Sequence, residues 1–130
     1  MGWLNRLFGS SSRDDVQQPV RTYTVGIVGE SHKNPDGSSR QAEIRRCREG
    51  EQVQLLAEPH NPYDALAVSV LSQRGTCIGY ISRDHNEWVG KKLEAGAMMS
   101  TTIHAIIGGE KGKQSRGVLL SIAIARPTGD

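Results

Sequence analysis

Apolar and polar residues alternate with a period of two along most of the chain beyond residue 21. Such alternation is typical of strands that bury one face and expose the other. Turn residues interrupt it, among them Pro35, Asp36 and Gly37, the turn at residues 73–75 and the glycine-flanked loop at residues 108–117. The pattern predicts six strands, at residues 22–28, 52–58, 66–71, 76–81, 98–107 and 118–125.

Two short stretches break this alternation and carry the start and stop signals of helices. Ser38 followed three residues later by Gln41 has the spacing of a capping box, and it predicts a helix that ends near Gly50. This helix would place Ile44 and Cys47 on one buried face. We therefore expect Cys47 to be a core residue and not a reactive thiol.

Asp84 and Glu87 repeat the same spacing and predict a second helix that stops at Gly96. Its buried face would consist of Trp88, Val89 and Leu93. The resulting order is strand, helix, three strands, helix and two strands. This order favours a mainly β fold with two short helices, a small and partly open six-stranded barrel, over an alternating parallel sheet.

The length of 130 residues, with 36% hydrophobic residues, suits one domain better than two. We expect that domain at residues 21–126, preceded by an apolar segment and linker at residues 1–20 and followed by a tail at residues 127–130. The 16 Lys and Arg against 14 Asp and Glu leave a net charge of +2, which excludes a polycationic tail. Nucleic-acid binding would therefore have to come from a local patch.

The chain has two cysteines, Cys47 and Cys77, which cannot build a disulfide scaffold or a Cys-x-x-Cys zinc site. No apolar run approaches the length of a membrane span, and the N-terminus lacks the pattern of a secretory signal. We expect a reducing, cytoplasmic setting. No motif predicts a cofactor.

The N-terminal segment carries four large apolar residues at helical spacing: Trp3, Leu4, Leu7 and Phe8. A helix this short is unstable alone in water. The segment is either a frayed start or a staple that packs onto the domain, or it is an anchor that docks on a partner or a membrane surface.

The segment at residues 58–64, Glu-Pro-His-Asn-Pro-Tyr-Asp, concentrates the chemistry of the chain. Two prolines stiffen it, and Tyr63 beside Asp64 puts a flat ring next to a carboxylate. This pair suits a nucleotide, because the ring can stack on a base and the carboxylate can accept a hydrogen bond from a sugar hydroxyl. The alternative is a structural turn in which Asp64 caps local backbone and Tyr63 packs on the barrel.

The chain resembles the HIRAN domain family over roughly residues 22–125. The resemblance rests on Glu-Pro-x-Asn-Pro-Tyr-Asp-x-x-Ala-Val at residues 58–68 and on Ile-Gly-Tyr-Ile at residues 78–81. Gly-Glu-Ser-His at residues 29–32 and Gly-Glu-x-Val-x-Leu at residues 50–55 extend it. The family is a small OB-like barrel, found alone in bacteria and phages or fused to remodelling ATPases, helicases and nucleases.

The resemblance implies binding of DNA, in particular of a single-stranded 3′ end. Tyr63 would then stack on the terminal base and Asp64 would hold its 3′-hydroxyl. Asn61 and Tyr80, which belong to the matching motifs, are expected to be further DNA-binding residues. Arg83 corresponds to a position where relatives carry a basic residue that faces DNA.

The chain departs from the family pattern in two places. His32 follows Ser31 where DNA-end-binding members carry an Arg-Tyr pair, so the stacking platform is smaller, although a charged histidine can contact phosphate. The last hairpin loop has no aromatic ring, but Lys111, Lys113 and Arg116 offer phosphate contacts instead.

Two further clusters carry less weight. Arg40, Arg45, Arg46 and Arg48 are expected to form a solvated basic helix face that could extend a phosphate track. The cluster at residues 83–87 brings a histidine close to carboxylates, but its spacing fits a helix cap better than a metal or catalytic site.

We therefore expect a non-enzymatic module that binds single-stranded DNA at its 3′-hydroxyl end, in repair, replication or remodelling. The rival hypothesis is a protein-interaction adaptor that recruits or assists a helicase, nuclease or remodelling ATPase through its N-terminal segment.

Overall fold

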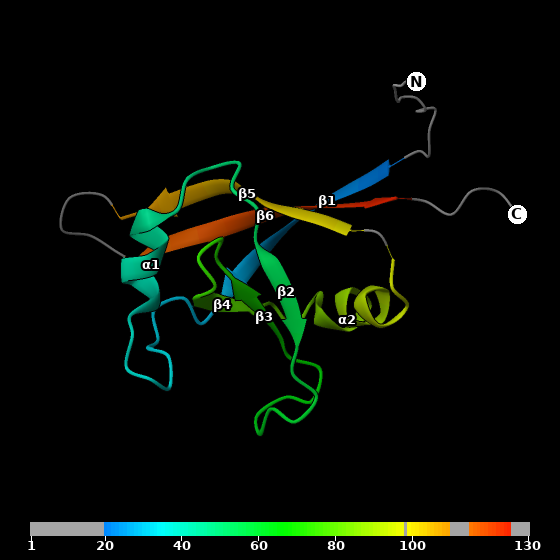
Figure 1. The fold of residues 1–130 in the computed structure, drawn as a ribbon, viewed down its shortest axis with the longest axis horizontal. Helices are drawn as coiled ribbons and strands as arrows, with labels where there is room; N and C mark the ends of the chain where they lie inside the picture. Colours follow the sequence, from blue (N-terminus) through cyan, green and yellow to red (C-terminus); the bar gives the residue numbers. More distant parts are fainter. Residues whose placement is uncertain (1–19, 98, 110–114, 126–130) are drawn as a thin grey trace, which may run out of the picture.

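The computed structural model describes residues 20–97, 99–109 and 115–125 of the chain (Figure 1). Its elements follow the predicted order of strands and helices. They are β1 (Val20–Val28), α1 (Arg40–Arg46), β2 (Gln54–Ala57), β3 (Val68–Leu71), β4 (Cys77–Ile81), α2 (Asn86–Glu94), β5 (Met99–Gly108) and β6 (Arg116–Ala125). No helix in these ranges is long and apolar enough to cross a membrane.

The six strands form one antiparallel sheet in the order β2-β3-β4-β1-β6-β5. Strand β1 links the two halves of this sheet. Residues 20–26 pair with residues 119–125 of β6, whereas Ile27 and Val28 pair with β4. The sheet consequently curls, so that β5 and β6 lie across the short strands β2, β3 and β4 (Figure 1).

Backbone hydrogen bonds close part of the remaining gap between β5 and the segment just before β2. The amide of Gly50 donates to the carbonyl of Ile103 at 2.8 Å, and the amide of Val53 donates to Thr101 at 2.9 Å. The amide of Ile103 donates in return to Glu51 at 2.9 Å. These bonds confirm the predicted mainly β, partly open barrel, and they explain why β2 is shorter than predicted.

The core fills the inside of the curl and receives side chains from every layer. Strand β6 alternates as predicted, with every second residue buried from Val118 to Ile124. Ile44 and Cys47 of the first helical segment are both buried, which confirms their predicted core positions. Val89 of α2 is also buried, as predicted. Trp88 and Leu93 pack against this core while remaining half-buried.

Both predicted helices form, but neither predicted cap is correct. The N-cap of α1 is Ser39, whose Oγ accepts from the amide of Ala42 at 3.0 Å. The carboxylate of Asp36 instead holds Ser38, through its amide at 2.9 Å and its hydroxyl at 2.7 Å. This Asx-type turn keeps Ser38 in the loop and delays the helix by one residue.

The predicted partner of that cap, Gln41, has a different role. Its amide nitrogen donates to the carbonyls of Glu30 and Arg116, and its oxygen accepts from the amide of Arg116 at 2.8 Å. It therefore ties α1 to the ends of β1 and β6. The helix ends at Arg46, earlier than the predicted Gly50, because the backbone after Cys47 turns to meet β5.

The second helix begins at Asn86, with His85 and not Asp84 at the N-cap. No side chain caps this end, because the amides of His85 and Asn86 both donate to the carbonyl of Ser82 at 3.0 and 2.9 Å. The carbonyl of Ser82 in the preceding turn thus takes the place of the side-chain acceptor that was predicted at Asp84.

A partly buried ionic cluster fixes α1 to the turn between β3 and β4. Glu43 is 5% exposed, and its Oε2 accepts from the Ser72 hydroxyl and from Nε of Arg74, both at 2.6 Å. Arg74 also approaches Glu51 at 3.5 Å. Burial alone would raise the pKa of Glu43, but the hydrogen bonds from Ser72 and Arg74 outweigh it and hold that pKa below its ordinary value.

Candidate nucleic-acid interface

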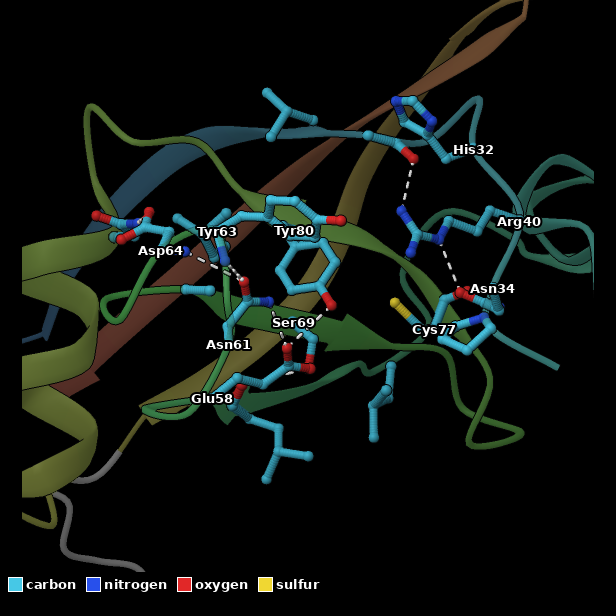
Figure 2. Close-up of a pocket in the computed structure, with 18 of the residues that line it drawn as sticks. His32, Asn34, Arg40, Glu58, Asn61, Tyr63, Asp64, Ser69, Cys77 and Tyr80 are labelled. Atoms are coloured by element: carbon cyan, nitrogen blue, oxygen red, sulfur yellow. Dashed lines mark hydrogen bonds between the residues drawn. The ribbon is translucent and has the colours of Figure 1, made fainter.

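A broad open groove of about 1600 Å³ runs between the loop after β1 and the loop between β2 and β3. The outer part of β4 contributes Tyr80 to its lining. Figure 2 shows Tyr80 between the two loops, with Tyr63 and Asp64 on one side and Arg40 and Asn34 on the other. Six of the nine sequence-predicted site residues line this groove: His32, Asn61, Tyr63, Asp64, Tyr80 and Arg83.

Asn61 builds the turn that presents Tyr63 and Asp64. Its Oδ1 accepts from the amide of Tyr63 at 2.8 Å and from the amide of Asp64 at 3.2 Å. Its Nδ2 donates to Oε1 of Glu58 at 3.0 Å, which closes the base of the loop. The side-chain oxygen of Asn61 thus pairs two backbone amides of the turn. The prolines on either side have no amide hydrogen and cannot donate such bonds.

The Tyr63 ring is 85% exposed and lies beside the groove instead of packing on the barrel. The alternative in which this ring belongs to the barrel surface is therefore wrong. A large aromatic ring held out from a rigid turn costs hydrophobic free energy unless a partner covers it. An open ring of this kind offers a stacking platform.

Both carboxylate oxygens of Asp64 already have partners inside the protein. Oδ1 accepts from the amide of Leu66 at 2.9 Å, so the predicted backbone cap is present. Oδ2 accepts from Nδ2 of Asn86 at 3.0 Å and faces Nε of Arg83 at 3.4 Å. The Leu66 amide, with Asn86 and Arg83, lowers the pKa of Asp64, so the group remains ionised at neutral pH.

Tyr80 supports the turn from below. Its hydroxyl donates to Oε1 of Glu58 at 3.0 Å, the same atom that Asn61 contacts. Burial and this hydrogen bond raise the pKa of Tyr80 to about 12, so it is a permanent donor. Gly79 makes its position possible, because a Cβ there would lie 2.8 Å from the carbonyl oxygen of Val28 on the paired strand.

Two basic residues, Arg83 and His32, stand on the rims of the groove. Arg83 has a side chain that is 75% exposed, and its Nη2 donates to the carbonyl of Tyr63 at 3.3 Å. His32 is exposed on the opposite loop, where its amide donates to the carbonyl of Gly29 at 3.1 Å.

Of the predicted residues in the last hairpin, only Arg116 is described, and it stands apart from the groove. Arg116 begins β6 and is not part of the lining, and its side chain packs so closely on Gly109 that a Cβ there would lie 2.5 Å from Cγ of Arg116. Lys111 and Lys113 lie outside the described residues, as does the apolar segment with Trp3, Leu4, Leu7 and Phe8.

Sequence reasoning missed four groove residues: Asn34, Arg40, Glu58 and Asn86. The expected solvated arginine face is wrong for Arg40, which is 8% exposed, while Arg45, Arg46 and Arg48 are exposed. The sequence did offer a signal for Glu58, because this residue begins the motif at residues 58–68 that carries the family resemblance. For Asn86, at the start of α2 and 3% exposed, the sequence offers no signal.

The cluster at residues 83–87 does not converge on one site. His85 accepts at Nδ1 from the indole nitrogen of Trp88 at 3.1 Å, which directs its ring into local packing. Asp84 and Glu87 are exposed. Within the part of the chain that the structure describes, no group of three or more His, Cys, Asp and Glu side chains is placed to hold a metal ion.

Comparison with solved structures finds the same fold in two proteins. The crystal structure of the HIRAN domain of human HLTF matches with a TM-score of 0.60 and 16% identity, over 79% of this chain and 74% of that chain. A protein from Lactobacillus plantarum matches with a TM-score of 0.62 and 24% identity, over 83% of this chain and 99% of that one. No curated protein matches this sequence significantly.

The family assignment comes from the sequence itself. The model of the HIRAN domain matches residues 22–117, which include β2 to β5, both helices, most of β1, the start of β6 and both loops of the groove. The first of the two structural matches has the same domain in its name. The chain therefore belongs to the HIRAN domain family, whose members are generally DNA-binding modules.

Proposed function

We propose that this domain binds single-stranded DNA and recognises the free 3′-hydroxyl end. The observation that supports the proposal best is the pairing of an exposed Tyr63 ring with an ionised Asp64 carboxylate on one rigid turn at the groove. We place this function in the cytoplasm, on DNA under repair, replication or remodelling. A binding role needs no catalytic group, and we propose none.

Tyr63 supplies affinity without selecting a base. Stacking of one base on an aromatic side chain contributes about 1–3 kcal/mol and tolerates every base. The turn fixed by Asn61 holds the ring in place before DNA arrives, so little conformational freedom is lost on binding.

Asp64 supplies the selection for an end. A carboxylate offers about four acceptor sites, and Leu66, Asn86 and Arg83 use three of them. A 3′-hydroxyl can donate to the remaining site. A phosphate at that position would bring two negative charges together and supply no donor, so a continuing strand is disfavoured.

Basic side chains supply the phosphate contacts. Arg83 and His32 stand on its two rims, and we assign Lys111, Lys113 and Arg116 a second set of contacts farther along the strand. Asn61 and Tyr80 act by holding the turn and not by touching DNA.

The test is a set of equilibrium titrations at one salt concentration. The ligands are labelled single strands with a free 3′-hydroxyl, with a 3′-phosphate, and with only the 5′ end accessible. A hydrogen bond to a charged group implies a preference of roughly 10- to 100-fold for the hydroxyl end. Equal affinity for the hydroxyl and phosphate ends would overturn the proposal and favour the adaptor hypothesis, whose apolar segment lies outside the described residues.

A further inference from the structure

Arg40 is a buried cation in the lining of the groove that the 3′-end proposal does not use. It is the first residue of α1, and only 8% of it is exposed. Figure 2 shows its guanidinium on the opposite side of Tyr80 from Tyr63 and Asp64. The guanidinium carbon lies 5.4 Å from the centre of the Tyr80 ring.

The guanidinium is fixed by two short hydrogen bonds to neutral groups. Nε donates to Oδ1 of Asn34 at 2.7 Å, and Nη1 donates to the carbonyl of Gly29 at 2.8 Å. Asn34 is held in turn by the carbonyl of Cys77 at 3.1 Å. The remaining nitrogen, Nη2, forms no hydrogen bond with any described residue.

The charge of Arg40 also lacks a counterion within residues 20–97, 99–109 and 115–125. Two other arginines, Arg74 and Arg83, differ in this respect, although both are more exposed than Arg40. Arg74 pairs with Glu43 and Glu51, and Arg83 pairs with Asp64. Burying a guanidinium without a carboxylate costs free energy, and a bound anion would recover it.

We propose that Arg40 binds a backbone phosphodiester of the strand whose 3′ end lies at Tyr63 and Asp64. This inference rests on the proposed function and adds the path of the strand to it. A guanidinium matches the geometry of phosphate oxygens, and one that is already fixed loses little entropy when it binds.

The pair of charges also sets the direction of the strand. Asp64 repels phosphate on one side of Tyr80, and Arg40 attracts it on the other. A strand with a free 3′ end satisfies both only when its terminal sugar lies at Asp64 and its backbone continues toward Arg40. The opposite direction would place a backbone phosphate at the carboxylate.

The experiment combines protein variants with single neutral linkages in the DNA. Each phosphodiester of a short strand with a free 3′-hydroxyl is replaced in turn by a methylphosphonate, and each strand is titrated against the full chain. The variants are Arg40→Gln and, as a matched control on the same helix, Arg45→Gln, which removes an exposed charge. Arg40→Lys, which keeps the charge but loses the planar fork, serves if Arg40→Gln does not fold.

A methylphosphonate at one particular linkage near the 3′ end should lower the affinity of the wild type about tenfold. For Arg40→Gln, a methylphosphonate at this linkage should no longer lower the affinity, while the effects at the other linkages stay the same. The slope of log affinity against log salt concentration should become shallower by about 0.7. Arg45→Gln should keep the wild-type profile. Arg40→Lys should show a smaller penalty at the same linkage and an unchanged salt slope.

A purely structural Arg40 would weaken all strands alike and leave the linkage profile intact, which would overturn the inference. The two proposals fail separately. A preference for the 3′-hydroxyl without any linkage coupled to Arg40 refutes only the phosphate contact. A coupled linkage without an end preference refutes only the end recognition.

Discussion

Asp64 has two functions at the scale of a single residue. Its oxygens hold the turn through Leu66 and hold α2 through Asn86, and the same carboxylate is proposed to receive the 3′-hydroxyl. The internal partners orient the group before DNA binds and keep its pKa low. The proposed end recognition therefore uses an acceptor that the fold has already positioned.

The first prediction concerns the substitution Asp64→Asn, which keeps the shape of the side chain and removes its charge. The preference for a 3′-hydroxyl over a 3′-phosphate should narrow, chiefly because the phosphate end binds better. Tyr63→Ala is the control, since lost stacking should weaken both ends equally by about 1–3 kcal/mol. Titrations of both ends at fixed salt measure the effect, and an unchanged ratio in Asp64→Asn would contradict the assigned role.

Arg40 shows why residue-scale roles are hard to predict from sequence. In the sequence it is one of four arginines on an amphipathic helix, and such charges are usually solvated. Its burial depends on Gly29 and Tyr80, which belong to two other strands or their loops. Only the folded topology brings these three residues together.

At the scale of elements, the alternation of apolar residues correctly predicted the six described strands. The reading of cap and stop residues correctly predicted that two helices form. It failed at the helix starts, where side chains compete for the same backbone groups. Asp36 captures Ser38, and the carbonyl of Ser82 takes over the acceptor role predicted for Asp84. Helix existence follows from burial of a face, whereas helix boundaries depend on local hydrogen bonds that a residue pattern does not specify.

The second prediction concerns the contact of α1 with the turn after β3. Glu43→Gln should lower the free energy of unfolding by about 1–2 kcal/mol at pH 7, because the acceptor of Ser72 and Arg74 loses its charge. The pKa of Glu43 is lowered by folding, so its contribution is complete above the ordinary value of 4.5 and is lost as the pH falls through the folded value. The gap between variant and wild type should therefore close in acid.

Denaturant unfolding at several pH values measures this gap. Glu87→Gln is the matched control, because Glu87 is 66% exposed and pairs with Lys91 across solvent at 3.5 Å. Its effect should be within about 0.5 kcal/mol at every pH. A gap for Glu43→Gln that does not change between pH 7 and pH 3 would show that the charge of Glu43 is not the stabilising feature.

The third prediction concerns the hairpin between β5 and β6. Replacing Lys111, Lys113 and Arg116 with Ala should weaken all single strands alike and flatten the log–log salt slope by roughly 2 units, at about 0.7 per phosphate contact. The double variant Lys91→Ala and Lys92→Ala removes exposed charges from α2 and should leave the slope unchanged. If both variants give the wild-type slope, the phosphate contacts lie elsewhere.

The fourth prediction concerns the whole molecule. Deleting residues 1–18 should leave the barrel folded and its DNA binding nearly intact, because residues from Val25 to Ile124 already form a contiguous apolar core. Thermal unfolding and titration of the shortened chain test this expectation. A fall of several degrees in Tm would show that Trp3, Leu4, Leu7 and Phe8 belong to the core and would argue against a docking role.

The pairing of β1 with β6 brings the two ends of the described domain together, an arrangement that suits insertion into a larger protein. Val20 and Ala125, the first and last described residues, are opposite each other in that pairing, so the chain enters and leaves the barrel about 5 Å apart. The groove begins at the far end of β1, roughly 25 Å away along the strand. A loop of a larger protein could therefore accept this domain with little distortion of either partner, and the groove would still lie away from the insertion point.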